Sequence, residues 1–450
     1  MCWYEIIRYI GNNRLKFLLV KIRSEINAYI YPMNIGIIGL GDMGSVCARK
    51  WASSGFTVYG CDLPERYEIL KEQFSDTSVV VLQTSNDVAR VADFLLFSVE
   101  ASNIGKVVAQ TASSVKYGSI ISGQTSVKTP EIAAFEKYLP EDVHIVTCHS
   151  LHGPAFSTEG QKLIVVNHRS TEEAYRRAYE VFQALESQII EVADYQQHDQ
   201  IMADTQAVTH MGFESMGTAW KNAGFYPWDH GAYSNGIDNV KILTTLRIFS
   251  YKAHVYAGLA ILNPFARKQV RQYAKSESEL FKMMICEQED LFRERIQAAS
   301  RFVFHGERDF ITLDPEVMKD FKMAEKADDY MPNSHLSLLA MVDAWYQIGV
   351  NPYENLICQT PPFRLRLGIA EYLFKNADLL EETIQTALYD KSIRADDLEF
   401  HSAVREWASI IEYGDMSGYL SHFDQVKDFF SDRLQEGAQQ SSKLIAKLTS

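Results

Sequence analysis

Residues 34–44 read NIGIIGLGDMG, an apolar run that predicts a strand, then the spacing Gly39-x-Gly41-x-x-Gly44, then an amphipathic helical pattern. In dinucleotide-binding turns the first glycine permits the tight turn and the second lets the backbone approach a pyrophosphate. The third glycine lets helix and strand pack closely. The pyrophosphate then lies at a helix N-terminus, whose unpaired N–H groups and partial positive charge favour an anion. The stretch therefore predicts a nucleotide site, and an ordinary βα turn is the alternative.

The sequence downstream of this turn agrees with a nucleotide-binding sheet. A second apolar run, residues 57–61, ends at Asp62, which lies 18 residues past Gly44 and could bind a ribose hydroxyl. Short apolar runs alternate with helical patterns up to about residue 192, which predicts a mostly parallel α/β sheet. The predicted strands are 34–40, 57–62, 78–83, 93–99, 119–124, 144–150, 162–168 and 188–192. After Asp194 the apolar spacing is helical, so the remainder should be all α.

Composition narrows the class of protein. The chain has 450 residues, 46% of them hydrophobic, which is enough for two or three domains. Its net charge is −14 and it has no basic tract, so nucleic acid is not an expected partner. Its six cysteines show no metal-binding spacing, so we expect no metal site and reduced thiols in the cytoplasm. No apolar stretch is long enough for a membrane span. Residues 1–32 form an extension resembling neither a signal nor a transit peptide.

The helical half contains an internal repeat. Thr209-His210, Ala219-Trp220, Gly224 and Pro227-Trp228 recur as Ser334-His335, Ala344-Trp345, Gly349 and Pro352-Tyr353, at a constant offset of 125. Each copy continues into an arginine-bearing helix, with Arg247 in the first and Arg364 in the second. We interpret residues of about 203–263 and 330–380 as two copies of one helical unit, with general helical-hairpin similarity as the alternative. Such copies could pack as the two halves of a dimer do, within one chain.

Two clusters follow predicted strands, at the sheet edge where open α/β folds bind ligands. One is Gln124–Lys128 and the other is Thr147–Pro154, which includes His149 and His152. A histidine at such a strand end can accept a hydroxyl proton while hydride leaves the same carbon. His149 is our candidate for that role, and His152 could instead shape the loop. From composition alone, a structural role is the commoner fate of either histidine.

At these residues the chain resembles a known family, prephenate dehydrogenase, most closely its fungal form. The resemblance covers nearly all of residues 33–435. Its motifs are IGIIGLGDMG at 35–44, SVEASNI at 98–104, GQTSVKTPEI at 123–132, HSLHGP at 149–154, TEGQ at 158–161, HD at 198–199, ADTQAVTH at 203–210, PNSHLSLLA at 332–340 and DDLEF at 396–400. The resemblance implies a Rossmann-type dinucleotide-binding domain over 33–193, followed by an all-α domain over 194–450 that contains the duplication.

The family also implies a reaction and its residues. Hydride leaves C4 of prephenate for a nicotinamide, the 4-hydroxyl loses its proton and carbon dioxide departs, which yields 4-hydroxyphenylpyruvate. The implied catalytic residues are His149 and Ser126, and the implied substrate contacts are Lys128, His152, His210, Arg247 and Arg364. The implied cofactor contacts are Gly39, Leu40, Gly41, Asp42, Met43, Gly44, Asp62, Arg66, Ser98, Glu100 and Thr125.

The sequence departs from the family pattern at two places. Ser150 replaces the proline that usually follows the catalytic histidine. The arginine with which bacterial members bind a substrate carboxylate falls at Gly258 and Tyr372 in the two repeats, so Arg247 or Arg364 is expected to replace it.

The cofactor and the reaction each leave an alternative. Asp62 favours NAD, but fungal members use NADP and Arg66 could hold a 2′-phosphate, so we favour NADP. Rival functions are arogenate dehydrogenase, a ketol-acid reductoisomerase or a non-catalytic NADP sensor. Either a homodimer or a monomer with an internal pseudo-dimer would fit the duplication.

Overall fold

The computed structural model describes residues 33–154, 156–229, 236–306, 311, 313, 331–354 and 360–449. The predicted extension at 1–32 lies outside these residues. The chain forms two compact units. One contains the chain up to Thr125 together with Pro130–Tyr195, and the other contains Ser126–Thr129 together with the chain from Gln196 onward. Each unit is described by itself below.

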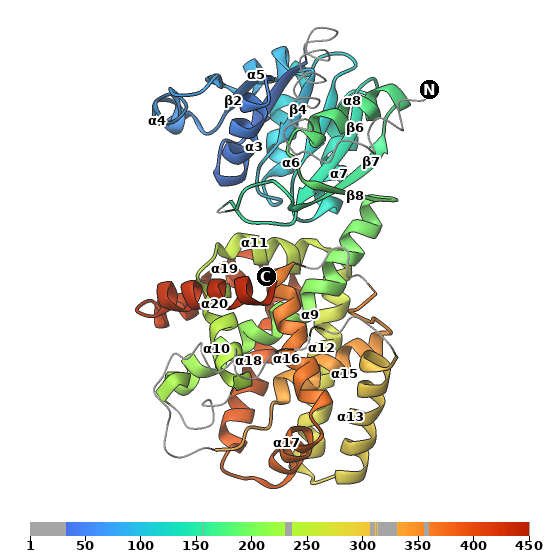
Figure 1. Ribbon diagram of the computed structural model, residues 1–450, viewed down its shortest axis with the longest axis vertical. Coiled ribbons are helices and arrows are strands. Elements are labelled where there is room, and N and C mark those ends of the chain that lie inside the picture. Colours follow the sequence, from blue (N-terminus) through green and yellow to red (C-terminus); the bar gives the residue numbers. More distant parts are fainter. Residues whose placement is uncertain are drawn as a thin grey trace, which may run out of the picture. The chain divides into compact units, whose positions relative to one another are not determined.

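The first unit is built on a sheet whose eight described strands lie in the order β3-β2-β1-β4-β5-β6-β7-β8 (Figure 1). The strands are β1 (Asn34–Ile38), β2 (Thr57–Cys61), β3 (Val80–Val81), β4 (Phe94–Phe97), β5 (Ile120–Gly123), β6 (His144–Ser150), β7 (Lys162–Arg169) and β8 (Gln188–Val192). All neighbouring strands are parallel except β6 and β7. The predicted mostly parallel α/β sheet is confirmed. Strand order reverses between β1 and β4, and such a switch point is where open sheets bind ligands.

Helices cover both faces of this sheet. They are α3 (Asp42–Ser53), α4 (Tyr67–Gln73), α5 (Ser85–Val91), α6 (Ile104–Thr111), α7 (Lys128–Tyr138) and α8 (Glu172–Gln183). Successive strand side chains point to opposite faces, so β1 contributes Ile35 and Ile37 to one apolar cluster and Ile38 to another. Trp51 of α3 is fully buried in the first cluster and donates its indole N–H to the Val181 carbonyl of α8 over 2.8 Å. Apolar runs buried on both faces explain why these strands could be predicted.

The second unit is helical, as predicted. Its described α-helices are α9 (Tyr195–Ala223), α10 (Gly236–Phe249), α11 (Ala253–Ala257), α12 (Pro264–Ile285), α13 (Glu289–Phe304), α15 (Leu336–Ile348), α16 (Pro361–Lys375), α17 (Ala377–Tyr389), α18 (Arg394–Tyr413), α19 (Met416–Phe429) and α20 (Leu434–Thr449). One turn of π-helix, η5 (Gly258–Leu262), follows α11. None of the described helices is long and apolar enough to cross a membrane.

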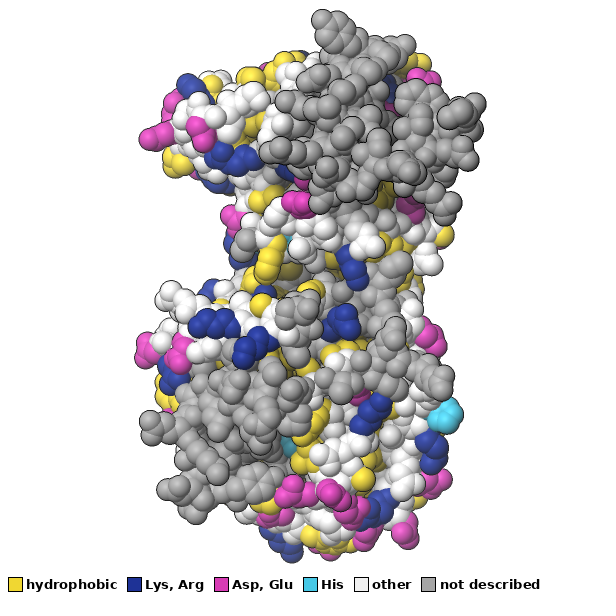
Figure 2. Space-filling model, viewed as in Figure 1, with side chains coloured by type: hydrophobic (Ala, Val, Ile, Leu, Met, Phe, Trp, Pro, Cys, Tyr) yellow, Lys and Arg dark blue, Asp and Glu magenta, His cyan; other side chains and the backbone are white. Residues whose placement is uncertain are grey.

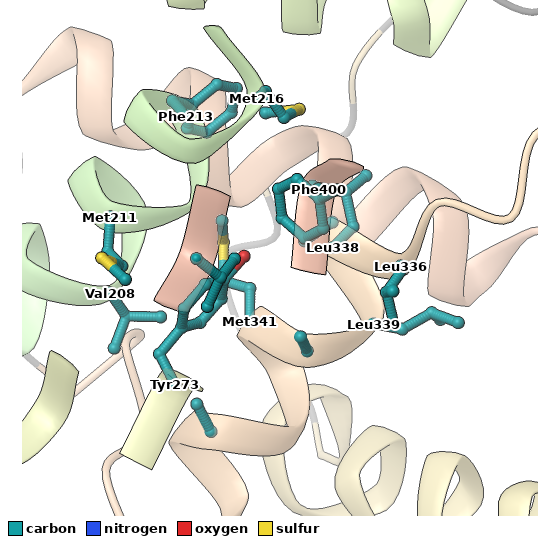
Figure 3. Packing of buried hydrophobic residues seen from close by; sticks show 14 of the residues in the cluster. Val208, Met211, Phe213, Met216, Tyr273, Leu336, Leu338, Leu339, Met341 and Phe400 are labelled. Carbon is teal, nitrogen blue, oxygen red and sulfur yellow. The ribbon is translucent and has the colours of Figure 1, made fainter. Parts of the chain in front are cut away.

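The core of the helical unit joins the two predicted copies. Figure 3 shows Val208, Met211 and Phe213 of α9 facing Leu338 and Met341 of α15, with Tyr273 of α12 and Phe400 of α18 completing the cluster. The Tyr273 hydroxyl donates to the backbone carbonyl of Ser337 over 3.2 Å, which satisfies its polar atom inside the apolar cluster.

The first helices of the two copies end in the same way. Gly224 follows α9 with φ 72° and Gly349 follows α15 with φ 69°, a left-handed conformation that favours glycine. The next N–H in each copy bonds back to a tryptophan carbonyl, from Phe225 to Trp220 over 3.2 Å and from Val350 to Trp345 over 3.0 Å. Identical caps at the offset of 125 support a duplication. Superposition of the two copies stays a prediction.

Candidate active site

Each glycine of the turn after β1 has a distinct steric environment. Gly39 has φ 99°, and a Cβ there would lie 2.2 Å from the Ser98 carbonyl oxygen. A Cβ on Gly44 would lie 2.0 Å from the Gly39 carbonyl oxygen, so this position holds helix and strand together. A Cβ on Gly41 would meet nothing within 4 Å. Gly41 is also the N-cap of α3 and forms no side-chain cap. Open space above uncapped N–H groups fits a bound pyrophosphate.

The residues beside Gly41 divide by exposure. Leu40 is fully buried and contacts the position where Gly60 would carry a Cβ, at 2.8 Å, whereas Asp42 is exposed and Met43 partly exposed in the first turn of α3. The side chain of Leu40 thus anchors the turn, and the backbone of its neighbours faces outward.

Asp62 follows β2, the neighbour of β1 in the sheet. Its carboxylate accepts the Leu63 N–H over 2.8 Å and pairs with the guanidinium of Arg66 over 2.8 Å. The Arg66 side chain is 37% exposed, so the guanidinium is accessible while it pairs with Asp62. Both an acceptor for ribose hydroxyls and a cation for a 2′-phosphate are therefore present at this strand end.

Two further predicted cofactor residues follow β4. Ser98 donates its N–H to the Ile38 carbonyl over 2.8 Å, and its hydroxyl accepts from the Gln124 side-chain amide. Glu100 is exposed and accepts from the Asn103 side chain over 3.2 Å. Ser98 thus ties the end of β4 to the neighbouring end of β1 and to the end of β5.

A buried carboxylate that sequence reasoning missed fixes the ends of β5 and β6. Glu131 of α7 is fully buried and accepts the Thr125 N–H over 3.1 Å and the Thr125 hydroxyl over 2.7 Å. The Thr147 hydroxyl of β6 contacts the other carboxylate oxygen. Thr147 precedes His149 on the same strand by two residues, so both side chains face the same side of the sheet. The signal was available as the glutamate of TPEI, within the GQTSVKTPEI motif.

His149 lies near the end of β6, opposite Ile164 of β7, and is partly exposed. Ser150, the residue in place of the usual proline, is the last residue of β6. His152 lies in the following loop, where its Nδ1 is 3.1 Å from the Gly153 carbonyl oxygen. Its Nε2 is buried and has no hydrogen-bond partner within the described part of the chain.

The segment Ser126–Thr129 is attached to the helical unit by Asp199 of α9. This fully buried carboxylate accepts the backbone N–H groups of Lys128 and Thr129 over 2.7 and 2.8 Å, at the N-terminus of α7. The His198 ring lies 2.8 Å from the same carboxylate, and these hydrogen bonds hold the pKa of Asp199 below its usual value. The HD motif is therefore a helix cap. Lys128 is fully buried and Ser126 partly exposed.

His210 of α9 lies beside a cation. Its ring packs edge-on against Tyr256 with centroids 4.8 Å apart. Burial and the positive charge of Arg366 lower the pKa of His210 well below 6.5, so the ring is neutral at pH 7. Its Nδ1 is buried without a hydrogen-bond partner among the described residues.

Arg366 of α16 is the second functional candidate that sequence reasoning missed. It is 4% exposed, and its Nη1 donates to the Thr209 hydroxyl over 3.3 Å. Within the described residues it forms no ion pair, and its Nε lacks a hydrogen bond. Burial is the main reason that the pKa of Arg366 falls to about 10. Arg364, the residue predicted from the sequence, lies on the exposed side of the same helix.

The repeat itself could have identified Arg366. Helices α10 and α16 begin at Gly236 and Pro361, so the offset of 125 continues and pairs Arg366 with Lys241 rather than pairing Arg364 with Arg247. The contacts follow the same pattern, because Lys241 Nζ lies 3.0 Å from Nδ1 of His335, the counterpart of His210. Each histidine thus lies beside the cation of the other copy.

The two cations differ in charge balance. Lys241 forms a 2.8 Å ion pair with Asp238, whereas the position 125 residues after Asp238 is Phe363. Glu214 also acts on Arg366, but burial raises the pKa of this carboxyl to about 7, so it is only partly ionised at neutral pH. Lys241 is therefore neutralised by its neighbour, and the positive charge of Arg366 is not.

Arg247 is 8% exposed and donates to Ser442 over 2.9 Å and to the Tyr251 hydroxyl over 2.8 Å. It lies close enough to Arg366 for the two charges to repel each other. Among the described residues no three His, Cys, Asp or Glu side chains are placed to hold a metal ion.

Comparisons with known proteins agree with this geometry. Residues 34–194 match the family NAD binding domain of 6-phosphogluconate dehydrogenase, and residues 207–450 match a family of 6-phosphogluconate dehydrogenase C-terminal domains. Prephenate dehydrogenase [NADP(+)] of Saccharomyces cerevisiae is 45% identical over 425 residues, covering 92% of this chain and 94% of its own. Probable prephenate dehydrogenase [NADP(+)] of Schizosaccharomyces pombe is 41% identical over 419 residues, covering 92% and 97%.

A crystal structure of prephenate dehydrogenase from A. aeolicus aligns with 60% of this chain and 96% of its own, at 17% identity and a TM-score of 0.49. The two full-length relatives and the match of the C-terminal domain decide the family. The chain belongs to the prephenate dehydrogenase family, in the branch whose C-terminal domain is of the 6-phosphogluconate dehydrogenase type.

Proposed function

We propose that this protein oxidises prephenate with NADP, releasing carbon dioxide and 4-hydroxyphenylpyruvate, as a step of tyrosine biosynthesis. The observation that carries the proposal is the 45% identity, over 92% of the chain, to a relative named Prephenate dehydrogenase [NADP(+)]. Aromatisation of the ring supplies much of the driving force. The protein therefore has to orient a hydride donor, a proton acceptor and two carboxylates.

NADP supplies the hydride acceptor. Its pyrophosphate would lie over Gly41, where the structure leaves open space beside the N-terminus of α3. The ribose hydroxyls would bind Asp62, and Arg66 would turn from Asp62 to the 2′-phosphate, a charge-assisted contact that NAD cannot make. The ends of β4 and β5 would line the rest of the cofactor site through Ser98, Glu100 and Thr125.

His149 takes the proton of the 4-hydroxyl in this proposal. Glu131 is a positioning residue, because it holds Thr147 on the strand that carries His149 and holds Thr125 on the neighbouring strand. His152 and Ser126 would help to orient the substrate hydroxyl. The peptide of Lys128 is already held by Asp199, which leaves this lysine a role in fixing the segment that carries Ser126.

Arg366 binds the pyruvyl carboxylate in this proposal, in place of the Arg364 predicted from the sequence. A buried, uncompensated guanidinium is costly until an anion offsets its charge, which makes this arginine suited to hold a carboxylate. Neutral His210 can hydrogen-bond to the same group without competing for its charge. The departing carboxylate needs weaker contacts, since stabilising the ground state alone slows the reaction.

The test uses the purified full-length chain with prephenate and either NADP or NAD, followed at the absorbance of reduced nicotinamide. We expect prephenate-dependent reduction that is faster with NADP. Arogenate in a parallel assay distinguishes the rival enzyme, and the His149→Asn variant serves as the inactive control. Cofactor binding without turnover of either substrate would instead support an NADP sensor.

We also propose that the protein is a cytoplasmic monomer whose repeats form a pseudo-dimer. Support comes from four free cysteines among the described residues, as expected in a reducing compartment, and from the crossed contacts of the two copies. Light scattering on the purified chain would report a mass near 51.2 kDa for a monomer and twice that for a homodimer.

A further inference from the structure

A basic cavity opens in the helical unit at the C-terminal end of α10, against α19 and α20. Its volume is about 710 Å³, within the range of small-molecule sites. The described lining includes Arg247, Lys427 and Lys443, together with the hydroxyls of Tyr251 and Ser442, and it contains no acidic side chain. Figure 2 shows dark blue Lys and Arg side chains on the surface where Figure 1 draws α20. In a chain of net charge −14, such a lining favours anions locally.

Arg247 makes this cavity more than a surface patch. More than nine-tenths of the residue is buried, and its guanidinium donates only to neutral hydroxyls, those of Tyr251 and Ser442. Its charge also lies 5.1 Å from the centroid of the Tyr251 ring. Within the described part of the chain no carboxylate lies within ion-pair distance of it. A buried cation costs free energy unless an anion compensates it, and the open side of Arg247 faces the cavity.

We propose that this cavity is an effector site for a phosphate group, held by Arg247, Lys427 and Lys443. A guanidinium matches two phosphate oxygens, and the two lysines add mobile positive charges. The phosphate could be free inorganic phosphate or part of a phosphorylated metabolite, since both present the same oxyanion. Nothing in the proposed reaction requires this ligand.

The site is positioned to influence Arg366. The positive charge of Arg247 acts on Arg366, and a phosphate bound to Arg247 would screen it. The positive potential that attracts a carboxylate to Arg366 would then fall. This coupling rests on the proposed function, and it predicts a saturable, severalfold rise in the KM for prephenate, with little change in kcat.

Binding is tested without catalysis, by calorimetric titration of the full-length chain with inorganic phosphate at constant ionic strength. The variant is Lys427→Ala with Lys443→Ala. The matched control is Lys282→Ala with Lys391→Ala, two exposed lysines of the same unit outside the cavity. We expect one saturable site in the wild type and the control, and at least a tenfold weaker affinity in the cavity variant. A second titration with a sugar phosphate distinguishes the metabolite from free phosphate.

Three results would overturn the proposal. The first is the absence of saturable phosphate binding, and the second is equal affinity in the cavity variant and the control. The third is a raised KM for NADP or prephenate in the cavity variant in phosphate-free buffer, which would assign the cavity to the ligands of the reaction. If phosphate binds as expected but the protein does not turn over prephenate, the effector site stands and the proposed function fails.

Discussion

Replacing Arg366 by methionine separates a binding role from a structural one. Burial holds the pKa of this guanidinium at about 10, against 12.5 for an ordinary arginine. The charged form at pH 7 therefore carries a cost on the order of 3 kcal/mol in the folded protein. A substrate carboxylate would offset that cost, and a charge-assisted contact of this kind is worth about 1.5–3 kcal/mol. Arg366→Met should raise the KM for prephenate by roughly 10-fold to 150-fold.

The stability of the same variant gives an independent readout. Removing a buried, uncompensated charge should leave the free energy of unfolding unchanged or increased, since methionine fills much of the same volume. The assay is initial-rate kinetics at saturating NADP, with urea unfolding measured on the same preparation. Arg364→Met, which replaces an exposed arginine on the same helix, is the matched control and should change neither quantity.

A KM within threefold of the wild type would refute the substrate role of Arg366. A loss of several kcal/mol of stability would refute the claim that its charge is uncompensated. Arg366→Lys provides a further check, because it keeps a cation but not the planar fork, and partial rescue of KM is expected.

Four other predictions concern the rest of the chain. His149→Asn should lower kcat on the order of 100-fold to 10,000-fold with nearly unchanged NADP affinity, and a fall below fivefold would move the general base elsewhere. Arg66→Ala should weaken NADP binding by roughly 10-fold to 150-fold and leave NAD almost unaffected, whereas equal losses would place the 2′-phosphate elsewhere. Gly41→Ala should leave Tm unchanged but weaken cofactor binding, and Gly44→Ala should lower Tm, because only the second Cβ meets backbone. Burial raises the pKa of Glu214 from 4.5 to about 7, so its stabilising contribution is complete below pH 4.5 and is lost as the pH rises to about 7. Glu214→Gln should flatten unfolding free energy over that interval, with an effect on the order of 3 kcal/mol, and an unchanged pH profile would contradict this assignment.

The sheet unit could be predicted almost entirely from the sequence. Each strand is an apolar run buried on both faces, and the glycine turn carries local steric requirements that do not depend on distant residues. The predicted end of β3 was less accurate, since residues 78–83 were predicted and the strand spans Val80–Val81. Such an edge strand is exposed and its apolar pattern is a weaker signal.

The roles of charged groups were harder to predict because they depend on partners far along the chain. Glu131 belongs to a motif that the sequence displayed, but its contact with Thr147 exists only when β6 lies beside β5. Asp199 likewise caps a helix 70 residues earlier in the chain.

What the sequence determined by itself was the class of fold, the nucleotide turn and the presence of a repeat, because local periodicity and local sterics carry that information. Only the tertiary structure decided which arginine is buried without a counterion. Arg364 and Arg366 are two residues apart on one helix and therefore point to nearly opposite sides. Which side is buried depends on the packing of α16 against its neighbours, and whether a buried charge is compensated depends on residues from the other copy.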